Sequence, residues 1–212
     1  KMTETLSLRA KIEQSPMGAY QWMIVAMAAI MNLLDGFDVL ALAFTATAIR
    51  NEFGLTAIEL GYLLSAGLFG MAAGSLFLAP LADKIGRRPL LLMAVLLSTI
   101  GMLGSAFISQ YQWLGFWRVI TGLGVGGILA GTNVITSEYS SRKWRSFAIS
   151  VYAAGFGVGA VLGGMFAVML QGEYGWRSVF LAGAILTGIF LVLLFIWLPE
   201  SIDFLTTKQP KN

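Results

Sequence analysis

Residues 32–38 read Asn-Leu-Leu-Asp-Gly-Phe-Asp and lie inside a long apolar stretch, from about residue 20 to residue 48. Residues three or four apart share one face of a helix, so Asn32, Asp35 and Asp38 form a polar stripe that Thr45 continues. An ionised group at bilayer depth costs roughly 2.5–3.5 kcal/mol on insertion scales, and two neighbouring acids also repel each other. We therefore expect this stripe to face a protein interior or a water-filled cavity.

The composition is that of a polytopic membrane protein. Of the 212 residues, 57% are hydrophobic and 12% are charged, and the mean hydropathy is +0.77. Soluble domains carry about 25% charged residues. The net charge of +3 does not indicate nucleic-acid binding, because the basic residues cluster in short loops. The chain has neither Cys nor His and shows no nucleotide-binding loop or catalytic triad spacing, so we expect no metal, no cofactor and no enzymatic activity.

Six segments are long and apolar enough to cross a bilayer, which requires about 20 residues in a helix. They cover about residues 17–46, 57–81, 89–109, 112–137, 146–170 and 177–198. Ser15-Pro16 resembles a helix start, with a hydroxyl cap followed by proline. We expect residues 1–15 to form a cytoplasmic, interfacial segment, residues 16–200 the transmembrane bundle, and residues 201–212 the start of a central cytoplasmic loop.

The basic residues are divided unequally between the two sides of this bundle. Eleven Lys and Arg residues fall on one side, in the two terminal segments and in the loops after the second and fourth spans. On the other side stand Arg50 and Arg177 alone. Because cytoplasmic loops are enriched in Lys and Arg, both termini are expected in the cytoplasm, with the chain in the plasma (inner) membrane.

Two loops on opposite sides of the membrane have similar sequences. Residues 83–88, after the second span, read Asp-Lys-Ile-Gly-Arg-Arg, and residues 173–177, after the fifth span, read Glu-Tyr-Gly-Trp-Arg. This predicts an all-α membrane protein built from two three-helix repeats of inverted topology, a recurrent plan among transporters. The first and fourth spans are then counterparts.

Several motifs resemble those of one transporter family. The loop at residues 81–89 resembles the signature loop between helices two and three of the major facilitator superfamily, with Ala79 where its leading glycine is usual. Arg118 with its following glycines resembles the helix-four motif, and Glu138 with Arg145 resembles the motif of the next loop, although Ser141 replaces a proline. Residues 198–201, Leu-Pro-Glu-Ser, resemble the end of helix six.

Residues 35–38, Asp-Gly-Phe-Asp, narrow the resemblance to the aromatic acid:proton symporter family. The resemblance implies a fold of twelve helices in two halves, of which this chain supplies the first six. It also implies import of a small organic anion, an aromatic carboxylate, with protons as the coupling ion. The missing C-terminal half, or a second copy of this chain as a homodimer, is then expected to complete the transporter in the lipid bilayer.

Asp35, Asp38 and Arg118 are the predicted proton-coupling residues. Two acids that share a site do not both ionise easily, so one of them is expected to hold a proton reversibly. For the aspartates the alternative is a structural role, in which neighbouring helices satisfy both groups. Arg118 is expected to form a fixed ion pair with an aspartate, to control their protonation, or to receive the carboxylate of the substrate.

The remaining candidate residues fall into two groups. The substrate-binding candidates are Asn32, Asp35, Asp38, Arg118, Asn133, Tyr152 and Phe156. The residues expected to gate the cytoplasmic face are Asp83, Gly86, Arg87, Arg88, Glu138 and Arg145, with Gly86 at positive φ in a tight turn. Gly155, Gly159 and Gly163, spaced by four, predict a close helix–helix contact.

Two other functions fit the same composition. One is proton-coupled transport of another metabolite, such as a sugar or a dicarboxylate. The other is a membrane module that binds a ligand as a sensor without transporting it, which is compatible with a chain that supplies half of a cavity wall.

Overall fold

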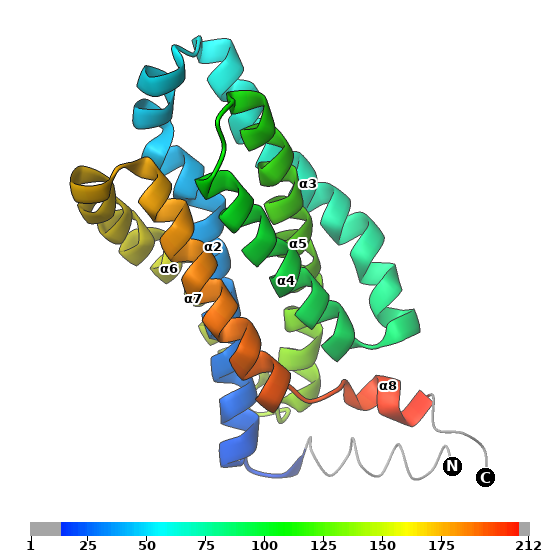
Figure 1. The fold of residues 1–212 in the computed structure, drawn as a ribbon. Helices are drawn as coiled ribbons and strands as arrows, with labels where there is room; N and C mark the ends of the chain where they lie inside the picture. Colours follow the sequence, from blue (N-terminus) through cyan, green and yellow to red (C-terminus); the bar gives the residue numbers. More distant parts are fainter. Residues whose placement is uncertain (1–13, 208–212) are drawn as a thin grey trace.

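The computed structural model describes residues 14–207, which contain helices and no strand. The helices are α2 (Ala19–Phe53), α3 (Ala57–Ile85), α4 (Arg87–Ala106), α5 (Tyr111–Tyr139), α6 (Arg145–Tyr174), α7 (Trp176–Trp197) and the short α8 (Ile202–Thr207) (Figure 1). Six of them, α2 to α7, are long and apolar enough to cross a membrane. The predicted all-α class and the six spans are therefore confirmed. Of the interfacial segment expected at residues 1–15, residues 1–13 lie outside the described residues.

The first helix differs from its prediction at both ends. It begins at Ala19 after the cap Gly18, whose N–H donates to Gln21 Oε1 at 2.7 Å, and not at Ser15-Pro16. It continues to Phe53, beyond the expected end near residue 46, and stops at Gly54, which has a φ of 64°. The prediction used hydropathy, which identifies the part of a helix that is surrounded by lipid and not the full length of the helix. A helix that projects into water can continue through polar residues, and a glycine at positive φ then ends it.

Helices α2 and α5 form the centre of the bundle. In the most apolar 18-residue stretch of each helix, 56% of the residues of α2 and 61% of those of α5 are buried, against 17% for α3 and 22% for α6. Helix α6 packs along α2 and helix α3 packs along α5, so that α3 and α6 lie on opposite flanks (Figure 1). The first and fourth spans therefore hold the interior positions, where polar side chains are shielded from lipid.

The pattern of helix contacts agrees with the inverted repeat. In this repeat α2 corresponds to α5, α3 to α6, and α4 to α7. The α2–α6 contact then corresponds to the α5–α3 contact, and the α7–α2 contact to the α4–α5 contact. All four contacts are present. The two similar loops also share one conformation, because Gly86 and Gly175 have φ values of 104° and 80°. The expected positive φ of Gly86 is confirmed.

Glycines on α6 permit its close contact with α2. A Cβ atom at Gly155 would meet the carbonyl oxygen of Ala29, and one at Gly159 would meet the carbonyl oxygen of Leu33. In each case the obstacle is main chain, which cannot turn aside as a side chain does. The spacing of four residues therefore serves packing, as predicted.

We expect Gly159→Ala to destabilise the bundle, because the added methyl group would push α6 away from α2. Overpacking of this kind costs about 1–3 kcal/mol. Thermal unfolding in detergent, followed by size-exclusion chromatography, measures the effect. The matched control is Gly157→Ala on the same helix, where no atom lies within 4 Å of the added Cβ. Equal midpoints for the two variants would contradict this assignment.

Candidate functional site

The polar stripe of α2 faces the interior of the bundle. Asn32, Asp35, Asp38 and Thr45 have exposed fractions of 3% or less. Since lipid contacts none of these side chains, the neighbouring helices determine which polar partners they find. The stripe has two parts, one around Asp35 and one around Asp38.

Asp38 points toward α4 and α7. Its Oδ2 accepts a hydrogen bond from Ser98 Oγ at 2.7 Å, and its Oδ1 has no hydrogen-bond partner among the described residues. Gly183 of α7 stands beside Oδ1, since a Cβ added at this glycine would lie 3.3 Å from that oxygen. The Asp38 carboxyl group is thus enclosed, with one oxygen bonded and the other open to a proton.

Asp35 lies in the second part, where α2 meets α5 and α6. Nearby, Asn32 Nδ2 donates to the main-chain carbonyl of Tyr152 at 2.8 Å, and Thr132 Oγ1 donates to the Tyr152 hydroxyl at 3.1 Å. Asp35 is close enough to interact electrostatically with that hydroxyl, while its own Oδ2 has no hydrogen-bond partner in the described part of the chain. Three predicted residues, Asn32, Asp35 and Tyr152, therefore belong to one cluster.

Arg118 binds the main chain of α2 and not the aspartate side chains. Its Nη2 donates to the carbonyl oxygens of Asp38 at 2.7 Å and Val39 at 3.3 Å, and its Nη1 approaches Met102 Sδ at 3.5 Å. The guanidinium carbon lies 5.9 Å from the centre of the Phe180 ring. Within residues 14–207 no ion pair joins Arg118 to Asp35 or Asp38, so the expected fixed ion pair is replaced by hydrogen bonds to carbonyl groups.

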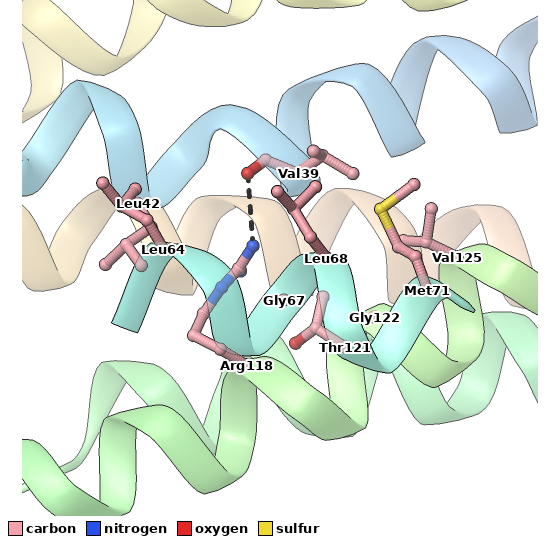
Figure 2. Close-up of a pocket in the computed structure, with 10 residues that line it drawn as sticks. All are labelled: Val39, Leu42, Leu64, Gly67, Leu68, Met71, Arg118, Thr121, Gly122 and Val125. Atoms are coloured by element: carbon pink, nitrogen blue, oxygen red, sulfur yellow. Dashed lines mark hydrogen bonds between the residues drawn. The ribbon is translucent and has the colours of Figure 1, made fainter. Parts of the chain in front are cut away.

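A small cavity lies beside this guanidinium group, between α2, α3 and α5. Figure 2 shows Arg118 crossing it toward the Val39 carbonyl, with Gly67 and Gly122 on its wall. Its volume of about 20 Å³ accommodates about one water molecule. Arg118 Nε is buried without a hydrogen-bond partner among the described residues. The guanidinium group of Arg118 thus keeps an unused N–H donor beside the cavity.

Two substrate-binding candidates lie apart from these clusters. Asn133 is exposed on α5. Phe156 is half-buried, and its main-chain carbonyl packs against Gly36 of α2. Sequence reasoning missed Ser98, because a single serine in an apolar helix gives no signal of its partner. The spacing of seven residues between Ser98 and Ser105 places both on one face of α4, and both are fully buried.

The predicted gate residues lie at the end of the bundle that carries α8, together with Glu200, which sequence reasoning did not place among them. Glu200 Oε1 accepts main-chain N–H bonds from Arg87 at 2.7 Å, Arg88 at 3.1 Å and Ser201 at 2.8 Å. The carboxylate therefore caps the N-terminus of α4, where the helix dipole favours a negative charge. Asp83 pairs with Arg87 at 2.7 Å.

The other gate candidates have separate contacts. Arg88 Nη2 donates to the Phe195 carbonyl at 2.7 Å. Glu138 Oε2 accepts from Ser201 Oγ at 2.7 Å and from the N–H of Ile202 at 3.1 Å, so it caps α8. Arg145 begins α6, and its N–H donates to the Ser141 carbonyl at 2.9 Å.

Comparison with known proteins identifies the family. The family model described as Major Facilitator Superfamily matches residues 28–211. The chain belongs to the Major Facilitator Superfamily.

Curated members of the superfamily resemble the chain over nearly its whole length. A gallate transporter of Pseudomonas putida is 36% identical over 93% of this chain and 44% of its own length. A 4-hydroxybenzoate transporter of the same organism is 34% identical over 97% of this chain and 46% of its own length. The chain therefore spans about half the length of the curated relatives that it matches.

A solved structure confirms the superfamily fold. The proton:xylose symporter bound to 6-bromo-6-deoxy-D-glucose superposes with a TM-score of 0.82 at 23% identity, over 90% of this chain and 47% of that chain. The chain thus has the six-helix architecture of one half of the superfamily fold and is an integral, multi-pass membrane protein. Among the described residues, no group of three His, Cys, Asp or Glu side chains could hold a metal ion.

We expect Glu200→Gln to loosen the end of the bundle where α4 begins, because the amide loses the charge that strengthens three hydrogen bonds to main-chain N–H groups. Hydrogen bonds to a charged group contribute about 1.5–3 kcal/mol. Thermal unfolding in detergent measures the loss. Glu173→Gln at the exposed end of α6 is the matched control. An unfolding midpoint that falls no further than that of the control would refute the capping role.

Proposed function

We propose that this chain is the first six-helix half of a secondary transporter that imports an aromatic carboxylate together with protons by alternating access. The observation that carries the proposal is the buried pair Asp35 and Asp38 on α2, beside the buried Arg118 of α5. The relatives that transport gallate and 4-hydroxybenzoate support this substrate class. The chain then acts as a transporter and not as an enzyme, and it needs no cofactor besides the proton.

Asp35 and Asp38 are the proposed proton carriers. Each has a carboxylate oxygen without a hydrogen-bond partner in the described part of the chain, and uptake of a proton would relieve the cost of a buried negative charge. The two groups lie one helical turn apart, so the charge state of one affects the other. Release of the proton on the cytoplasmic side would then accompany release of the substrate.

Arg118 is the proposed anchor for the anion. Its guanidinium group is held by two main-chain carbonyls, so no carboxylate of the described residues forms an ion pair with it, although Asp38 interacts with its charge from nearby. Its buried Nε beside the cavity supplies a free donor, and a guanidinium group binds a carboxylate with two parallel hydrogen bonds. Asn32 and Tyr152 are proposed to orient the substrate, and Asn133 and Phe156 to contact it from the side of the second half.

Uptake driven by a pH gradient tests these roles in the assembled transporter. We expect Asp35→Asn and Asp38→Asn to abolish accumulation of labelled 4-hydroxybenzoate against its gradient, because an amide carries no exchangeable charge. Exchange of substrate without a pH gradient should survive. We expect Arg118→Gln to raise KM at least tenfold, since a charge-assisted bidentate contact is lost.

Normal accumulation by both Asn variants would refute the proton-carrier role. Competition by unlabelled gallate, xylose and succinate in the same vesicles separates an aromatic-acid transporter from one for sugars or dicarboxylates. Saturable binding of 4-hydroxybenzoate with no uptake by the wild type would favour a ligand-binding module.

The second half of the transporter is a proposed partner. In this superfamily the halves are related by an axis along the membrane normal, so they have the same orientation. A C-terminal half, or a second copy of this chain in parallel orientation, satisfies that geometry. We propose that both termini lie in the cytoplasm and that the chain occupies the inner membrane, in keeping with the basic residues of its loops.

Crosslinking in lipid decides whether this chain pairs with itself. Only 17% of the residues in the most apolar stretch of the flanking helix α3 are buried in the described structure, so a partner is expected to cover its exposed face. We expect Leu76→Cys on α3, which is 68% exposed, to give a disulfide-linked dimer of the 212-residue chain. Trp197→Cys on α7, 52% exposed, is the control. A chain that stays monomeric at high protein-to-lipid ratio would refute the homodimer.

The cytoplasmic cluster is the proposed gate. Its members lie in the connection between α3 and α4, at the end of α5 and at the start of α6: Asp83, Gly86, Arg87, Arg88, Glu138 and Arg145. We propose that this cluster stabilises the state closed to the cytoplasm and separates in the open state. In the Glu200→Gln variant described above, a weakened gate predicts slower net uptake with substrate affinity unchanged.

A further inference from the structure

We propose that Ser98 of α4 is a positioning residue for proton transfer, and that its hydroxyl group sets the pH range in which the Asp38 carboxyl group binds and releases a proton. The inference deepens the proposed function at the same site. Its structural basis is a single interhelical hydrogen bond, and its test below does not depend on transport.

The Ser98 hydroxyl behaves differently from its neighbours on the same helix. Serine and threonine inside a helix commonly donate to the carbonyl four residues earlier. Thr99 does so toward Val95 at 2.8 Å, and Ser105 toward Gly101 at 2.7 Å. Ser98 instead donates across to α2, to Asp38 Oδ2 at 2.7 Å.

The packing of α4 on α5 holds Ser98 in this position. Gly124 of α5 lies directly against it, because a Cβ added at Gly124 would stand 2.6 Å from Ser98 N and 3.1 Å from Ser98 Cβ. Ser98 and Asp38 have exposed fractions of 0%. A rigid donor and a buried acceptor therefore meet without water between them.

Few other groups compete for the Asp38 carboxylate. Arg118, the charged residue that α5 presents here, bonds to the Asp38 main-chain carbonyl and also acts on the carboxylate through its charge. Asp35 stands one turn away on α2 itself. Thr187 of α7 is a second hydroxyl that interacts with the carboxylate, although it donates to the Gly183 carbonyl at 2.8 Å.

The helices packed around this site contribute no further charge at its depth. Among the described residues, the charged side chains of α3, α4, α6 and α7 lie near the ends of those helices. Tyr152, the titratable residue that α6 presents to the stripe, faces Asp35. The Ser98 hydroxyl thus makes the short, direct hydrogen bond to the carboxylate, at 2.7 Å.

A hydrogen bond donated to a carboxylate stabilises its ionised form relative to its protonated form. Loss of the Ser98 hydroxyl therefore favours the protonated acid, and deprotonation then requires a higher pH. The free energy of a hydrogen bond to a charged group corresponds to a shift of about one to two units in the pH at which the acid is half protonated.

Infrared difference spectroscopy of the purified protein in lipid tests this directly, through the carbonyl stretch of the protonated acid. Asp38→Asn identifies the band of Asp38. We expect Ser98→Ala to move the titration midpoint of that band by about one to two units to higher pH. We expect Ser105→Ala, which removes an equally buried hydroxyl from the same helix, to leave it unchanged.

A midpoint that Ser98→Ala leaves in place, or that Ser105→Ala moves as far, would overturn the proposal. The proposal would also fail if the band that Ser98→Ala moves were still present in Asp38→Asn, since Asp35 alone accounts for a band that remains there. The pH profile of uptake by the assembled transporter gives a second readout, with the same direction expected for Ser98→Ala. Because the infrared titration needs no substrate, a wild type without proton-driven uptake would refute the proposed function and leave the role of Ser98 to be judged by the titration.

Discussion

The structure depends on the burial of two carboxyl groups and one guanidinium group inside a membrane-spanning bundle. Charges removed from water are stable only with polar partners close by. Arg118 obtains them from the α2 main chain, and Asp38 obtains one from Ser98. Asp38 Oδ1 and Asp35 Oδ2 have no hydrogen-bond partner in the described part of the chain. A site that is incompletely satisfied in one state has the capacity to take up a proton or a ligand.

This requirement explains why α2 and α5 occupy the centre. Their polar residues need shielding from lipid, and α3 and α6 provide it by packing along them. Glycine contacts such as Gly159 against the Leu33 carbonyl bring the backbones so close that polar side chains reach across helices. The inverted repeat then places the acids on one central helix and the base on its counterpart.

The end of the bundle that carries α8 also depends on buried polar contacts, but with different chemistry. Glu200 places its carboxylate on the N–H groups that begin α4, and Glu138 does the same for α8. Carboxylates thus connect helix ends that are far apart in the sequence. The central site and this end lie on the same helices, so the proposed alternating access would couple a movement at one to a movement at the other.

Hydropathy and helical periodicity determined the six spans and the buried stripe of Asp35 and Asp38, and the similarity of two short loops indicated the inverted repeat and the positive φ of Gly86. Each of these can be read from residues that are near one another in the sequence or from a direct comparison of two segments. The tertiary structure decided the ends of α2, the main-chain partners of Arg118, the bond from Ser98 to Asp38 and the cap by Glu200. These depend on the register and rotation of one helix against another. Residues 60 positions apart, such as Asp38 and Ser98, become partners only when glycine contacts set that register.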